Sequence, residues 1–154
     1  MSSRAVFDCM VFLQAAARKD GPAAACLQLA RDRRLQLFVC LAILTEITDV
    51  LNRPRTRKKI NDLTPENVET FVRDVQSNSM RHDDIPLTFR FERDPKDEPY
   101  LNLAIAVGAD YLVTWDLDLL DLASADNHQA MAFRESFPTL RILTPVALLQ
   151  QLQS

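Results

Sequence analysis

The sequence predicts a three-layer α/β/α fold in which helices cover both faces of a central, mainly parallel sheet. Short apolar runs of strand length alternate along the chain with longer segments whose apolar residues recur at helical spacing. Strands that alternate with helices in this way pair in parallel, because each helix carries the chain back across the sheet. The length of 154 residues suits one compact core, so we expect a single domain over residues 1–154.

The first half of the chain predicts two strands and three helices. Gly21 and Pro22 open one helix, and Thr64 and Pro65 open another, since threonine caps helix starts and proline fits the first turn. A basic run at residues 53–59 follows the exit of the middle helix. The expected elements are a strand at residues 5–7, which the apolar residues 11–13 continue, a helix at 21–34, a strand at 35–40, and helices at 41–51 and 64–79.

The second half centres on residues 94–120, which predict a helix, a turn, a buried strand and a loop that carries acids. Pro99 lies in the first turn of that helix, and Gly108 ends it. The apolar run at 111–113 is typical of a strand that is buried on both faces. The remaining expected elements are a strand at residues 85–91, a polar segment at 124–138, a strand at 140–143 and a final helix at 145–152.

Composition excludes several classes of protein. A formal net charge of -3 argues against a general nucleic-acid binder, although acids that bind a metal shift the charge in the same direction. The three cysteines lack a paired short spacing, which disfavours a zinc site or a disulfide framework and favours the reducing cytoplasm. The two glycines are too few for a phosphate-binding loop. No apolar stretch has membrane-spanning length, so we expect a cytoplasmic protein without a membrane partner.

Acidic residues follow two of the predicted strands directly. Asp8 ends the strand at residues 5–7, and Asp116 and Asp118 follow the strand at residues 111–113. Because loops at the carboxyl ends of parallel strands form the ligand crevice, we expect these carboxylates at one edge of the sheet. Carboxylate oxygens are the ligands that Mg²⁺ and Mn²⁺ prefer, so the pattern indicates a site for a divalent ion.

Three acids, Asp94, Asp97 and Asp118, each have alternative roles. The helix onset favours Asp97 over Asp94 as a ligand, and Asp94 is expected to cap the loop. Asp118 fits two roles equally well, either a ligand through water or the cap of a helix that includes Leu119.

Several motifs occur in a fixed order along nearly the whole chain. They are FD at residues 7–8, LTE at 44–46 followed by VLNRP at 50–54, DPKD at 94–97, VTWDLDLL at 113–120 and LTP at 143–145. In this combination the sequence resembles PIN-domain proteins, and most closely the bacterial toxins of toxin–antitoxin pairs. The resemblance implies a metal-dependent endoribonuclease, a hydrolase whose catalytic and metal-binding acids are Asp8, Glu46, Asp97 and Asp116.

The resemblance also implies further site residues, a cofactor and partners. Asp118 is implied as an accessory metal ligand, and Thr114 as a supporting hydroxyl beside the site. Mg²⁺ or Mn²⁺ would activate water for phosphodiester cleavage, which needs no nucleophilic side chain. RNA is the expected substrate and a small cognate antitoxin the expected protein partner, with a homodimer as a further option. The expected RNA contacts are Arg53, Arg55, Arg57, Lys58 and Trp115.

The alternative function is a catalytically degenerate PIN module that binds RNA or a protein partner without cutting. The family follows its first aspartate with a small residue and then asparagine or serine, whereas Cys9 and Met10 stand here, and methionine cannot donate a hydrogen bond. Trp115 replaces a small residue and either stacks on a base or obstructs the groove. A haloacid-dehalogenase-type phosphatase needs an aspartate at position 10, and a receiver domain needs a strand-end lysine, so both are disfavoured.

Overall fold

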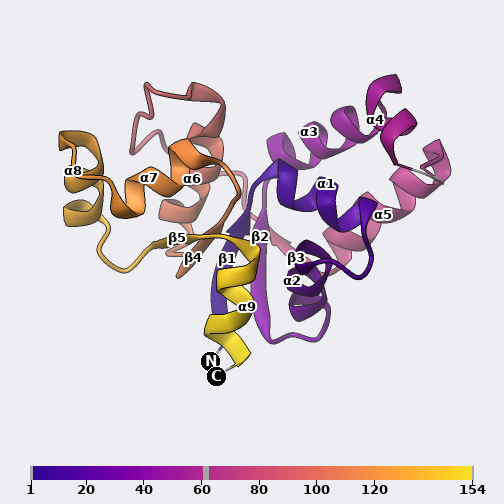
Figure 1. Ribbon diagram of the computed structural model, residues 1–154, viewed down its shortest axis with the longest axis horizontal. Helices are drawn as coiled ribbons and strands as arrows, with labels where there is room; N and C mark the ends of the chain where they lie inside the picture. The colour runs from indigo at the N-terminus through magenta and orange to yellow at the C-terminus, as the bar shows by residue number, and fades with distance from the viewer. Residues whose placement is uncertain (1, 61–62, 154) are drawn as a thin grey trace.

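The centre of the protein is a five-stranded sheet, which the computed structural model places within the described residues 2–60 and 63–153. Every pair of neighbouring strands in it is parallel, and the strand order is β3-β2-β1-β4-β5 (Figure 1). The strands are β1 (Ser3–Phe7), β2 (Leu35–Val39), β3 (Ser79–Arg81), β4 (Tyr111–Val113) and β5 (Arg141–Leu143). With helices flanking this sheet, the predicted α/β/α fold with a mainly parallel sheet is confirmed.

Helices connect all of these strands. None of those in the described ranges is long and apolar enough to span a lipid bilayer. The predicted helix at residues 41–51 has the same bounds in the structure, and Thr64 caps the next long helix by accepting a hydrogen bond from the Asn67 N–H. The helices are α1 (Cys9–Ala17), α2 (Pro22–Arg31), α3 (Leu41–Leu51), α4 (Pro54–Lys59), α5 (Pro65–Ser77), the 3-10 turn η1 (Pro95–Asp97), α6 (Glu98–Ala106), α7 (Leu117–Ser124), α8 (His128–Ser136) and α9 (Pro145–Gln153).

The strand order places a topological switch point between β1 and β4. From β1 the chain builds outward to β2 and β3, whereas β4 and β5 add to the other side of β1. In Figure 1, α1, α3 and α5 accordingly lie to the right of β1, and α6, α7 and α8 lie to its left. Loops that leave neighbouring strands in opposite directions open a crevice at the carboxyl edge of the sheet. The register pairs Phe7 with Val113, so Asp8 and Thr114 follow their strands at the same level.

The core fixes both strands that border this crevice. The side chains of Ala5, Val6 and Phe7 on β1 are almost completely buried, and so are those of Leu112 and Val113 on β4. Helix α6 packs against both strands, and α2 packs against β2 and α9. Residues that follow these strands therefore start from rigid, fully packed positions.

The first strand ends where Asp8 changes the direction of the chain. The apolar residues 11–13 were expected to continue that strand, but they belong to α1. The Asp8 side chain accepts a hydrogen bond from the Val11 N–H, which makes Asp8 the cap of this helix. Periodicity alone does not separate a short buried helix from an apolar strand of the same length.

The predicted strand at residues 85–91 is wrong, because this fully described stretch forms no strand. Pro86 lacks the N–H that a ladder requires. The side-chain oxygen of Asn102 on α6 instead accepts hydrogen bonds from the N–H groups of Thr88 and Phe89, at 2.8 Å each. The same amide donates to the Phe89 carbonyl at 2.9 Å, so one buried side chain takes the place of a neighbouring strand.

The polar segment at residues 124–138 contains a helix that its composition concealed. Asn127 caps α8 by accepting a hydrogen bond from the Ala130 N–H at 2.9 Å. Phe133, a residue of α8, is buried, and the centroid of its ring lies 5.1 Å from that of Phe89 and 5.3 Å from that of Phe137. Three aromatic rings therefore anchor a helix whose other positions are mostly polar.

Candidate metal centre

Asp8 lies at the carboxyl end of β1 and is 4% exposed. Its Oδ1 accepts a hydrogen bond from the Val11 N–H at 3.2 Å, and its Oδ2 accepts one from the Thr114 hydroxyl. Burial raises the pKa of Asp8 to about 6, since it outweighs the lowering by these hydrogen bonds, and the charge of Asp116 raises it further. The carboxylate is thus held in place while its charge lacks full solvation.

Thr114 links the ends of the two central strands. Its buried hydroxyl donates to Asp8 and also accepts a hydrogen bond from the Asp116 N–H at 2.9 Å. Asp116 in turn caps α7, with its Oδ1 accepting from the Asp118 N–H at 2.8 Å. One short polar chain therefore orients both acids that follow the strands.

Asp97 and Asp94 approach from the turn before α6. One ligand atom each of Asp94, Asp97 and Asp116 can be chosen so that all three lie within 4.8 Å of one another. Burial raises the pKa of Asp97 to about 8, and the charges of Asp116 and Asp94 act in the same direction. The Oδ2 atom of Asp97 is buried and has no hydrogen-bond partner among the described residues.

Glu46 comes to the same region from helix α3. Its Oε1 accepts a hydrogen bond from the hydroxyl of Tyr100 on α6. The neighbouring Cys9 thiol has its pKa raised to about 12, first by burial and then by the charges of Glu46 and Asp8. Burial also raises the pKa of Tyr100, and the hydrogen bond to Glu46 adds to that effect. Glu46 and Asp8 are thus both close enough to Cys9 for their charges to act on its thiol. Glu46 is not part of the tight group of three aspartates.

Asp118 forms an ion pair with Arg93, which competes with a role as a metal ligand. Its Oδ1 lies 2.8 Å from Nε of Arg93, which also reaches Oδ2 of Asp121 at 2.9 Å. Asp116, rather than Asp118, caps the helix, because the Asp118 N–H is the donor of that cap. A metal-binding role for Asp118 therefore remains a proposal that requires the carboxylate to share its charge with Arg93.

The structure joins two acids that the sequence treated as alternatives. Asp94 does cap the turn, since it accepts a hydrogen bond from the Lys96 N–H at 3.3 Å, yet it also lies in the group with Asp97 and Asp116. The spacing of three residues could have revealed this, because one tight turn brings such residues to the same side. Tyr100 carried no signal of its own in the sequence, since its partner Glu46 is 54 positions away.

The residues expected to contact RNA lie in two places. The basic run forms the short helix α4, whose Arg55 and Lys58 side chains are exposed, whereas Arg57 donates a hydrogen bond to Asn52. Trp115 is half-buried and packs against the core, and its Nε1 is buried without a partner among the described residues. Exposed cations on α4 are therefore better placed for phosphates than Trp115 is for a freely stacked base.

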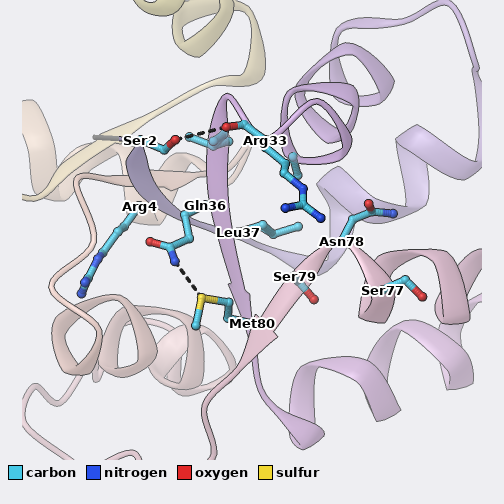
Figure 2. A pocket seen from close by; sticks show the side chains of 11 residues that line it. Ser2, Arg4, Arg33, Gln36, Leu37, Ser77, Asn78, Ser79 and Met80 are labelled. Atoms are coloured by element: carbon cyan, nitrogen blue, oxygen red, sulfur yellow. Dashed lines mark hydrogen bonds between the residues drawn. The ribbon is translucent and has the colours of Figure 1, made fainter.

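A separate pocket of about 480 Å³ lies near the amino ends of β1, β2 and β3, away from the acids (Figure 2). Its lining includes Arg4, Arg33, Gln36 and Asn78 and contains no carboxylate. Figure 2 shows the side-chain amide of Gln36, which donates a hydrogen bond to the sulfur of Met80. The pocket offers no carboxylate and shares no residue with the acidic group, so it is not part of the metal centre.

Comparisons with known proteins identify the family and a similar fold. The family described as PIN domain matches residues 4–118, a range that runs from β1 to the start of α7 and includes Asp8, Glu46, Asp94, Asp97, Asp116 and Asp118. The chain therefore belongs to the PIN-domain family, whose members are generally metal-dependent nucleases. The crystal structure of PAE2754 from Pyrobaculum aerophilum has a similar fold, with a TM-score of 0.61 at 20% identity over 98% of this chain and 90% of that one. No curated protein matches the chain.

The donor set fits a divalent cation. Three carboxylates held close together repel one another, and the buried Oδ2 of Asp97 accepts no hydrogen bond from the described residues. A cation among these oxygens would relieve both conditions at once. PIN domains typically bind divalent metals, so the chemistry of this group agrees with the family.

Proposed function

We propose that the protein is a metal-dependent endoribonuclease that hydrolyses RNA phosphodiester bonds. The observation that carries this proposal is the convergence of Asp94, Asp97 and Asp116, together with an Asp97 oxygen that is buried and has no hydrogen-bond partner among the described residues. Asp8 and Glu46 complete the proposed ligand set from β1 and α3. Mg²⁺ or Mn²⁺, when bound, would activate water and stabilise the leaving oxygen of the cleaved bond.

The protein's own residues would supply position and charge. Thr114 would keep Asp8 and Asp116 oriented through its two hydrogen bonds. Asp97 and Asp94 would enter the site from a turn that α6 and Pro95 hold rigid. The exposed cations of α4 would bind phosphates of the RNA beyond the cleaved bond. The resemblance to toxins of toxin–antitoxin pairs supports a small antitoxin as the protein partner, and a short neighbouring gene for a DNA-binding protein would strengthen that assignment.

The purified protein should cleave RNA only when Mg²⁺ or Mn²⁺ is present, because the proposed reaction needs a bound ion to activate the attacking water. A labelled RNA incubated with each ion, and with excess EDTA, measures this requirement. Undiminished cleavage in EDTA would remove the proposed mechanism. RNA binding and Mn²⁺ binding without any cleavage would instead favour the degenerate module, for which Met10 and the half-buried Trp115 are the structural grounds.

Replacing Arg55 and Lys58 with glutamine should weaken RNA binding and flatten its dependence on salt. Both side chains are exposed on α4, and each lost phosphate contact lowers the slope for a single strand by about 0.7. The slope is measured by titrating RNA at several salt concentrations in EDTA, so that the RNA stays intact. Arg18→Gln with Lys19→Gln removes the same charge after α1 and serves as the control. Equal slopes for the two double variants would assign α4 to another role.

A further inference from the structure

Glu46 differs from three other acids of the proposed site, Asp8, Asp94 and Asp116, in how it is held. Asp8, Asp94 and Asp116 each accept a hydrogen bond from a nearby backbone N–H of the turn that they cap. Glu46 lies in the middle of α3, where backbone N–H groups are already used within the helix. Its side chain is also longer, so more conformational freedom must be lost to fix its carboxylate.

Tyr100 supplies the contact that Glu46 does not find on its own helix. The tyrosine is 3% exposed and lies on α6, which packs against β1, β4 and α3. Its hydroxyl donates to Oε1 of Glu46, and its buried ring cannot swing away without opening the core. Tyr100 follows Asp97 by three residues, so both lie on one face of the same helical stretch.

We infer that Tyr100 is a positioning residue that holds Glu46 at the metal centre, an inference that rests on the proposed function. Met10 is 52% exposed and cannot donate a hydrogen bond, so the position after Cys9 offers no group to orient an acid. The Tyr100 hydroxyl provides such a donor from α6 instead. One helix thereby places two acids, Asp97 directly and Glu46 through Tyr100.

Loss of this hydroxyl should weaken metal binding. Partners that orient metal ligands typically change metal affinity by 10–100-fold when removed. Tyr100→Phe deletes one oxygen and keeps the ring that fills the core. We expect its dissociation constant for Mn²⁺, measured by calorimetric titration of the metal-free protein, to rise about tenfold.

A matched control is Tyr111→Phe, which removes the hydroxyl of a second buried tyrosine on β4. Its Mn²⁺ affinity should stay at the wild-type value. Glu46→Asp tests the same contact from the other side, because the shorter chain withdraws the carboxylate from the Tyr100 hydroxyl. This variant keeps the charge and the core, so it should show the loss of affinity even if Tyr100→Phe does not fold.

A double-mutant cycle separates positioning of Glu46 from a general effect of the tyrosine. In a Glu46→Ala background the hydroxyl has no carboxylate to orient, so adding Tyr100→Phe should cause no further loss of Mn²⁺ affinity. Losses that multiply in the double variant, or a Tyr100→Phe protein that binds Mn²⁺ as tightly as Tyr111→Phe, would overturn the inference and leave the proposed function standing. A wild-type protein that binds no Mn²⁺ would overturn both.

Discussion

Asp97→Asn and Asp116→Asn should each abolish RNA cleavage while leaving the fold intact. Asparagine keeps the shape of the side chain but removes the charge and one of the oxygens that a hard cation prefers. Loss of a residue that merely orients a ligand typically costs 10–100-fold, so loss of a direct ligand should cost more than about a hundredfold. The rate of cleavage of a labelled RNA at saturating Mn²⁺ measures this effect, and circular dichroism checks the fold.

Asp126→Asn provides the matched control for both variants. Asp126 is an exposed aspartate between α7 and α8, outside the acidic group, so the substitution should leave cleavage unchanged. A folded Asp97→Asn or Asp116→Asn protein that cleaves at the wild-type rate would remove that residue from the site. Equal losses in all three variants would indicate an effect of total charge rather than of metal binding.

The metal-free protein should lose stability as the pH rises from about 4 to about 8. Asp97 has its pKa raised from 3.8 to about 8 in the folded state, and Asp8 has its pKa raised from 3.8 to about 6. Between the unfolded and folded values, the folded state binds more protons than the unfolded state, so the free energy of unfolding falls with rising pH. This loss of stability is absent below the pKa that each aspartate has in the unfolded state, and it is complete above the pKa that the aspartate has in the folded state. Melting temperatures in EDTA across this range measure the trend.

Asp116→Asn should melt at a higher temperature than the wild type in EDTA above pH 8, where Asp97 is charged in the folded state. Two like charges about 4 Å apart repel by roughly 1–4 kcal/mol, depending on the effective dielectric, and the substitution removes one of them beside Asp97. One kcal/mol shifts the melting temperature of a chain of this size by roughly 2–4 °C. The variant should therefore melt several degrees above the wild type without metal.

Added Mn²⁺ should reverse that order. A ligand at a hundredfold excess over its dissociation constant stabilises the folded state by about 2.7 kcal/mol, and the variant has lost part of its affinity. The wild type should therefore gain more than the variant, whereas Asp126→Asn should follow the wild type in both buffers. If Mn²⁺ stabilises none of the three proteins, and Asp116→Asn melts no higher in EDTA, these acids share no metal site.

Local patterns predicted most of the fold because they match the packing that the chain adopts. Residues 5–7 and 111–113 are continuously apolar, and both are strands buried in the centre of the sheet. The helix at 41–51 was predicted with its observed bounds because its apolar residues recur at helical spacing and are the ones that the core buries. The stretch at 85–91 was wrongly predicted as a strand from its alternating pattern. Its backbone groups form hydrogen bonds with the side chain of Asn102 instead of with a neighbouring strand, and no local pattern reveals that partner.

The candidate site was predictable only in part for the same reason. Asp8 and Asp116 follow strands, so topology alone brings them to one edge of the sheet. Glu46 was predicted from the family resemblance, and Asp97 from that resemblance together with its place at a helix onset. The Tyr100 contact with Glu46 and the pairing of Arg93 with Asp118 depend on side chains from separate elements, which meet only after the helices pack.

The switch point between β1 and β4 also bears on when the protein can become active during its synthesis. The acids of the proposed site are spread from position 8 to position 116, and β4 must insert beside β1 before Asp116 meets Asp97. A nascent chain that ends between residues 97 and 111 carries Asp8, Glu46 and Asp97 but lacks the strand that joins the two halves of the sheet. During the first two thirds of its synthesis, the chain would therefore lack a complete copy of the proposed metal centre.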